Sequence, residues 1–165
     1  IGLQRIAALT QDAEAHATAD FFWRTVTETR SVAFGGNSVS EHFNPPDDFT
    51  KMLENREGPE TCNTYNMLKL TRHLFAWTAN ARYADYYERA LYNHILASVA
   101  ERDPGNTYHV PLNPGSRKRF GNARMDGFTC CNGTANKKAV SSRKRLGPIC
   151  CVDLAVVPFA GITQI

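Results

Sequence analysis

The sequence lacks the features that mark several specialised classes of protein. No apolar run approaches the ~20 residues of a membrane-spanning helix, and residues 154–160 are the longest candidate. We therefore expect no membrane partner. The chain begins without a methionine or the pattern of a secretory signal peptide, and no compartment is indicated. Its 165 residues, 42% hydrophobic and 21% charged, fit one globular domain.

The chain also lacks a strong overall charge. Its formal net charge is +3, but residues 136–165 alone contain five basic side chains and one acid, so the preceding part carries −1. A nucleic-acid-binding function would rest on this tail alone. We therefore expect no nucleic-acid partner.

The cysteine pattern does not fit a disulfide framework. Four of the five cysteines form adjacent pairs, 130–131 and 150–151, and a disulfide between neighbours closes a strained ring. The fifth is Cys62, and an odd number argues against complete pairing. Reduced thiols or metal ligands are the better interpretation.

Apolar spacing predicts three long helices, at residues 12–30, 61–79 and 82–101. Thr10 is the expected N-cap of the first. Its expected apolar stripe is Phe21, Phe22, Val26 and Val32, with Trp23 and Ala19 at the edge. Because a short turn joins the second and third helices, we expect them to be antiparallel neighbours.

The connecting segments are less regular. A loop of more than twenty residues ends at Glu60, and its length favours a functional role. Residues 108–112 are the most strand-like piece. From residue 136 the composition changes, and we interpret 136–165 as an atypical tail that is either frame-shifted or disordered. Residues 1–135 form the predicted helical domain.

A carboxylate and three thiols form a candidate zinc site: Glu60, Cys62, Cys130 and Cys131. Glu60 and Cys62 do not share a helix face, but both could act at a helix entrance. There the helix N-terminus would favour the thiolate of Cys62. Alone, Cys62 is better interpreted as a small buried apolar residue. The zinc site in turn could be structural or could carry a nucleophile.

Two further acids have both functional and ordinary interpretations. Glu41 follows a Gly-Gly turn and could act as a general acid or base, although composition alone favours a solvated loop acid. Glu88 lies among tyrosines, where it could bind a sugar, while Asp85 could pair with Arg89 in an ordinary helical ion pair. His73 and His94 are interpreted as surface or core histidines. The glycosylation motif at 132–134 is interpreted as coincidence.

Several motifs, in order, carry a resemblance to a known family. They are Gly35-Gly36-Asn37-Ser38, Glu41-His42-Phe43, residues 60–72 (ETCNTYNMLKLTR), residues 83–93 (YADYYERALYN), Tyr108, Pro111-Leu112 and Cys130-Cys131-Asn132-Gly133-Thr134. Over residues 5–135 the chain resembles the β-L-arabinofuranosidases of glycoside hydrolase families 127 and 146.

The resemblance implies an all-α fold, an (α/α)6 barrel of which this chain would be an internal part. It implies zinc held by Glu60, Cys62, Cys130 and Cys131, with Cys130 as nucleophile and Glu41 as acid/base. Glu88 and Tyr108 would contact substrate. The implied activity is retaining hydrolysis of β-L-arabinofuranosyl groups in arabinose-containing glycans. The alternative, from another class, is a non-catalytic helical module with a structural zinc site.

Overall fold

The computed structural model describes residues 1–100, 105–121 and 129–134. Within these ranges the regular elements are helices and no strand is formed, which confirms the all-α class. In the same ranges, no helix has both the length and the apolar character needed to cross a membrane. The predicted tail and domain boundary, with Cys150 and Cys151, lie outside the described residues.

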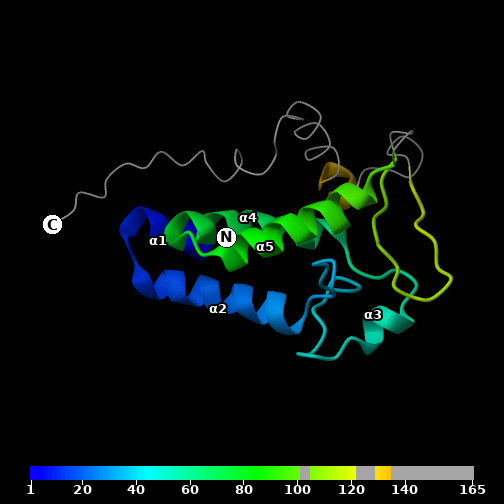
Figure 1. The fold of residues 1–165 in the computed structure, drawn as a ribbon, viewed down its shortest axis with the longest axis horizontal. Coiled ribbons are helices and arrows are strands. Elements are labelled where there is room, and N and C mark those ends of the chain that lie inside the picture. Colours follow the sequence, from blue (N-terminus) through cyan, green and yellow to red (C-terminus); the bar gives the residue numbers. More distant parts are fainter. Residues whose placement is uncertain (101–104, 122–128, 135–165) are drawn as a thin grey trace.

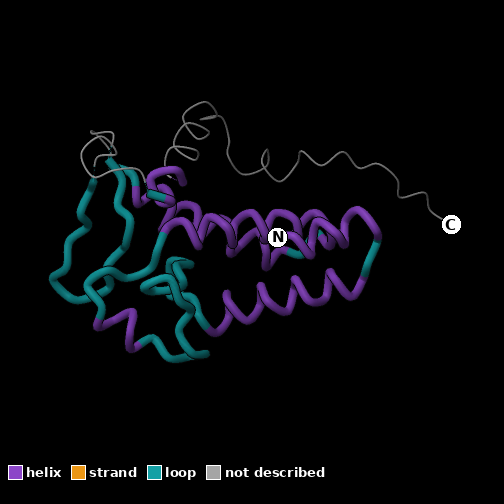
Figure 2. The backbone as a smooth tube through the Cα atoms, turned by 180° about the vertical axis from the view of Figure 1, so that it is seen from behind, coloured by secondary structure: helices purple, strands orange, loops and turns teal. Residues whose placement is uncertain are grey.

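Four helices form a bundle: α1 (Gly2–Thr10), α2 (Ala13–Thr29), α4 (Thr61–Thr78) and α5 (Ala81–Ala90). Loops gather at one end of the bundle, together with the short α3 (Thr50–Glu54) (Figures 1 and 2). The core of the bundle is apolar and comes from α2, α4, α5 and the turn after α5. Its fully buried members include Val26, Leu68, Leu70, Leu74, Tyr83, Ala90 and Ile95.

Local capping explains where α2 and α5 begin. The Asp12 carboxylate accepts hydrogen bonds from the backbone N–H groups of Glu14 and Ala15, so Asp12 is the N-cap of α2. The prediction of Thr10 as this cap was wrong. Thr10 ends α1, a helix the sequence analysis did not predict, and its hydroxyl donates to the Ile6 carbonyl. Asn80 caps α5.

The predicted apolar stripe of α2 was partly wrong. Trp23 and Val26 are buried, whereas Phe21 and Phe22 are 65% and 45% exposed. Trp23 faces α4 because its indole N–H donates to the Thr71 hydroxyl at 2.7 Å. Because the buried indole has its N–H bonded to α4, the rotation of α2 about its axis is fixed. In this rotation Phe21 and Phe22 lie outside the core.

The predicted third helix is interrupted. α5 ends at Ala90 and continues as a π-helical turn, η1 (Leu91–Ile95), and a 3₁₀ turn, η2 (Leu96–Ser98). For residues 108–112, which we expected to be loop or short strand, the structure has a loop with an isolated bridge from His109 to Glu60. A π-helical turn changes the direction of the side chains that follow it.

The loop end buries polar rather than apolar side chains. Asn37, Glu60 and Thr107 are each at most 2% exposed. Asn37 receives a hydrogen bond of 2.8 Å from Asn63 of α4, and its own amide donates to the Gly35 carbonyl. The loop is therefore shaped by hydrogen bonds to α4 and to its own backbone.

Candidate functional site

Three cysteines meet at the N-terminal end of α4. The sulfur atoms of Cys62, Cys130 and Cys131 lie within 4.8 Å of one another. Cys130 Sγ is 3.4 Å from Cys62 Sγ and 4.0 Å from Cys131 Sγ. Cys131 is buried and Cys130 is exposed. The structure thus brings together residues 68 positions apart and leaves one thiol open to solvent.

The short helical segment 130–134 positions two of these thiols. The Thr129 hydroxyl accepts from the Asn132 N–H at 3.2 Å, and the Thr134 hydroxyl donates to the Cys130 carbonyl. These two bonds fix both ends of the turn, as capping residues do. Asn132 is itself buried, which agrees with the interpretation of the 132–134 glycosylation motif as coincidence.

Glu60 precedes α4 and is 2% exposed. Its Oε1 accepts a hydrogen bond of 2.8 Å from the backbone N–H of Glu41. Glu41 itself has a positive φ of 65°, and φ is also positive at Ser38 (79°) and Ser40 (52°). A non-glycine residue in this conformation needs support from its surroundings. The Glu60 carboxylate therefore supports the backbone that presents Glu41.

Tyr108 joins Glu41 to the thiol cluster. Its hydroxyl donates to Glu41 Oε1 at 3.1 Å and lies 3.6 Å from Cys130 Sγ. Both Glu41 and Cys130 are exposed. A carboxylate, a phenol and a thiol thus meet at a surface that a substrate can reach.

Backbone pairing holds Tyr108 in this place. The Tyr108 carbonyl accepts from the Thr61 N–H at 3.3 Å, and the Val110 N–H donates to the Pro59 carbonyl at 3.1 Å. Gly58 lies directly under this pairing, where a Cβ would come within 2.3 Å of the Val110 carbonyl oxygen. A glycine is required here because its φ is +67° and the space is already filled.

Cys62 and Cys131 have pKa values shifted in opposite directions. Hydrogen bonds from Cys62 and other neighbours lower the pKa of Cys131 to about 6. The pKa of Cys62 is raised, chiefly because it donates to Cys131 and is partly buried. These shifts make Cys131 a more acidic thiol than Cys62, and the expectation that the helix N-terminus favours a Cys62 thiolate stays a prediction.

The donor set fits a soft metal ion. Three thiols gather near one another, and within the described residues no basic side chain forms an ion pair with the buried Glu60. Buried anionic groups need a compensating charge. The atoms that lie within 4.8 Å are the three sulfurs, whereas Glu60 directs Oε1 to Glu41. The cysteines could hold a metal ion.

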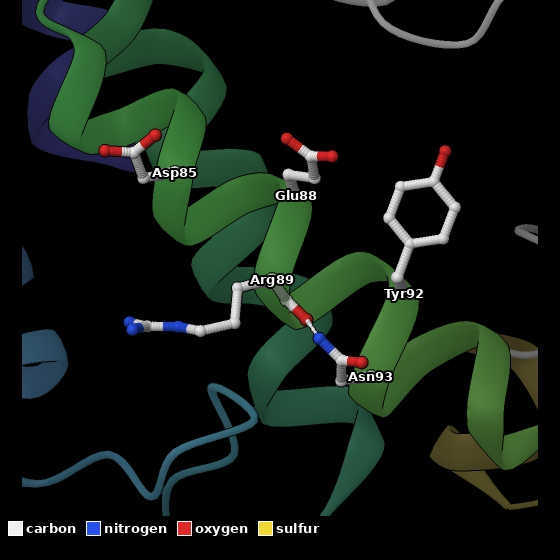
Figure 3. Close-up of a pocket in the computed structure, with 5 residues that line it drawn as sticks. All are labelled: Asp85, Glu88, Arg89, Tyr92 and Asn93. Carbon is white, nitrogen blue, oxygen red and sulfur yellow. Dashed lines mark hydrogen bonds between the residues drawn. The ribbon is translucent and has the colours of Figure 1, made fainter.

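Glu88 lies apart from this group. It is exposed on α5 and lines a shallow pocket with Asp85, Arg89, Tyr92 and Asn93 (Figure 3). Figure 3 shows Glu88 and Tyr92 pointing to one side of α5 and Arg89 to another. No ion pair joins Asp85 to Arg89 in the described part of the chain. Glu88 makes no described contact with the thiols or with Glu41.

Two features of the site were not predicted. The Asn37–Asn63 hydrogen bond joins the loop that carries Glu41 to α4. The only indication of this bond in the sequence was that Asn63 follows Cys62. The contact between Tyr108 and Glu41 had no signal in the sequence, because the two residues are 67 positions apart. The resemblance had assigned Tyr108 to substrate, whereas here it also connects Glu41 and Cys130.

Comparison with known proteins agrees with the motifs. The family model described as β-L-arabinofuranosidase, GH127 catalytic domain, matches residues 1–144. The resemblance to this family is thereby confirmed. No curated protein matches the chain.

Proposed function

The chain belongs to the GH127 family of β-L-arabinofuranosidase catalytic domains, and from this membership we propose that it is a retaining glycoside hydrolase. Its substrate is a β-L-arabinofuranosyl group in an arabinose-containing glycan. The observation that supports this most strongly is the Tyr108 hydroxyl in contact with both Glu41 and Cys130.

Retention requires a nucleophile and an acid/base residue that act on one anomeric carbon. In this proposal Cys130 Sγ attacks that carbon and forms a thioether bond, while the bond to the leaving oxygen breaks. Glu41 gives its proton to the leaving oxygen. It then takes a proton from the water that displaces Cys130 and restores the thiolate.

Tyr108 would orient Glu41 for this work. Its pKa is raised, first because of the hydrogen bond with Cys130 and then because of burial and the bond with Glu41, so the phenol stays protonated. Since its hydroxyl donates to Oε1, the catalytic proton would be held on Oε2 of Glu41. The Glu60 carboxylate supports the same residue through its backbone N–H.

We propose zinc as the metal, held by Cys62, Cys130, Cys131 and the free oxygen of Glu60. Soft thiolates favour zinc among the abundant divalent ions. When bound, it would supply the positive charge that keeps several neighbouring thiols ionised. The exposure of Cys130 and its contact with Tyr108 support a catalytic rather than a purely structural role.

The wider architecture is also proposed. Residues 1–135 would be part of an (α/α)6 barrel, in which the bundle supplies neighbouring helices, and residues 136–165 would be a separate tail. Glu88 would contact substrate from α5. A non-catalytic zinc module remains the alternative, and hydrolysis separates the two.

The test is stereochemical. The purified chain would be incubated with an aryl β-L-arabinofuranoside, and the first-formed sugar observed by NMR. We expect the β anomer before mutarotation, together with loss of turnover in Cys130→Ala. Appearance of the α anomer first, or undiminished turnover in Cys130→Ala, would overturn the mechanism.

A further inference from the structure

A second cleft opens beside Tyr108. It has a volume of about 920 Å³, and its walls come from residues 56–57 and from the loop 107–119. Pockets of this size bury most of a small ligand. Tyr108 belongs to both the cleft and the reactive site. An occupant would therefore reach the groups that carry the proposed chemistry.

The cleft has an excess of positive charge. Arg56, Arg117 and Arg119 line it, against one acid, Glu57. Glu57 Oε2 lies 3.9 Å from His109 Nε2. Within residues 1–100, 105–121 and 129–134, none of the three arginines forms an ion pair. Among these residues the three exposed guanidinium groups have no carboxylate partner, and their planar forks match a carboxylate ligand.

The cleft does not include the thiols, because none of the three clustered cysteines lines it, although Tyr108 beside Cys130 does. In a retaining mechanism the leaving group departs from the side opposite the nucleophile. A chain of sugars bonded to the attacked carbon would therefore run from Tyr108 into this cleft. The rings of Tyr108 and His109, with centroids 4.2 Å apart, give it an aromatic wall.

We propose that this cleft is a leaving-group subsite for glycans that carry carboxylates, namely glycans with a uronic acid next to the arabinofuranosyl group. The arginines bind the carboxylate and the aromatic wall packs against the sugar ring. The inference rests on the proposed function, because it places the leaving group in relation to Glu41 and Cys130.

Equilibrium binding tests the charge requirement. Calorimetry would compare a short oligogalacturonide with the same oligomer as its methyl ester, which keeps the shape and loses the charge. We expect the acid to bind at least about tenfold more tightly. The double variant Arg117→Gln/Arg119→Gln should lose this preference. Arg72→Gln, an exposed arginine of α4 that does not line the cleft, should keep it.

Three binding results would overturn the inference. They are equal affinity for acid and ester, an equal loss in Arg72→Gln, and equally tight binding of a poly-glutamate peptide, which would mark a general anion surface. Each would remove the assignment of the cleft to uronic acids.

A kinetic comparison separates this inference from the proposed function. The kcat/KM values of an arabinofuranosyl uronate and its methyl ester would be measured in the unmodified chain and in the double variant. We expect the ratio to fall at least about tenfold in the variant. Hydrolysis of both substrates with an unchanged ratio overturns the subsite and leaves the function. Charge-dependent binding without any hydrolysis overturns the function and with it the leaving-group role.

Discussion

The helical bundle and the loop end of this molecule are stabilised by different kinds of group. The bundle buries apolar side chains such as Leu74 and Tyr83, which contact one another across α2, α4 and α5. The loop end buries Asn37 and Glu60, which bind backbone N–H and carbonyl groups. Packing tolerates small changes of shape, whereas each buried hydrogen bond requires its own partner. The candidate reactive groups, Glu41 and the three thiols, lie in the second region.

The largest effect should separate chemistry from stability. Cys130→Ala is expected to lower kcat at least about 1000-fold, because the proposed nucleophile is lost. In the metal-free chain the melting temperature should change little, since the Cys130 side chain is exposed. Steady-state kinetics and thermal unfolding would measure the two. Cys151→Ala is the matched control and should keep full activity. A Cys130 variant that retains activity would remove this cysteine from the mechanism.

Truncation of a buried side chain in the bundle should affect stability rather than catalysis. Leu74 is fully buried, so Leu74→Ala should reduce the free energy of unfolding by about 2–5 kcal/mol. Leu9→Ala, on a side chain that is 76% exposed, should change it by less than about 0.5 kcal/mol. Denaturant unfolding measures both. Equal effects in the two variants would contradict the assignment of the core.

Two glycines test the backbone of the loop end. Gly58→Ala should cost about 2 kcal/mol or more, because its φ is +67° and the new Cβ would meet the Val110 and Pro111 backbone. Gly115 has a φ of +77° with open space around it, so Gly115→Ala should cost only about 1 kcal/mol. Unfolding experiments would compare them. A smaller cost at Gly58 would show that the pairing of 58–61 with 108–110 is not as described.

His94 gives a smaller effect that depends on pH. It is fully buried, its Nδ1 lies 2.9 Å from the Thr64 hydroxyl, and burial lowers its pKa to about 3. In the unfolded chain the pKa is about 6.5. Between these values the unfolded state binds more protons, so stability should fall as the pH is lowered, by up to about 1.4 kcal/mol per unit.

Replacement of this histidine should flatten the pH dependence. Between about pH 6.5 and 3, we expect the unfolding free energy of His94→Gln to depend less steeply on pH, because the titration of His94 no longer contributes. The exposed His42→Gln should keep the pH dependence of the unmodified chain. Unfolding free energies measured across this range give both slopes. An unchanged slope in His94→Gln would mean that the ring is accessible to protons in the folded state.

The sequence predicted the bundle better than the loop end. Helical spacing placed α4 to within a residue, because its buried positions recur with the helical period. It misplaced Phe21 and Phe22, since the rotation of α2 depends on the Trp23–Thr71 hydrogen bond between distant segments. The interruption after Ala90 likewise had no local signal.

The site was predicted as a set of residues rather than as a geometry. The resemblance selected Glu41, Cys130 and the other thiols, and the structure brings Cys62, Cys130 and Cys131 together. It could not place Tyr108 between Glu41 and Cys130, because that contact depends on the pairing of residues 59–61 with 108–110. The arginines of the cleft come from two segments and form no motif.

The central claim is that Cys130 is the nucleophile, and a trapped intermediate tests it most directly. Glu41→Gln would be mixed with an arabinofuranoside that has an activated leaving group, so that the covalent intermediate forms faster than it is hydrolysed. Intact-mass and peptide mass spectrometry would then locate any adduct. The account predicts one pentosyl unit on the peptide that contains Cys130, absent from Glu41→Gln/Cys130→Ala. A pentosyl unit on another residue, or turnover with none on Cys130, would contradict it.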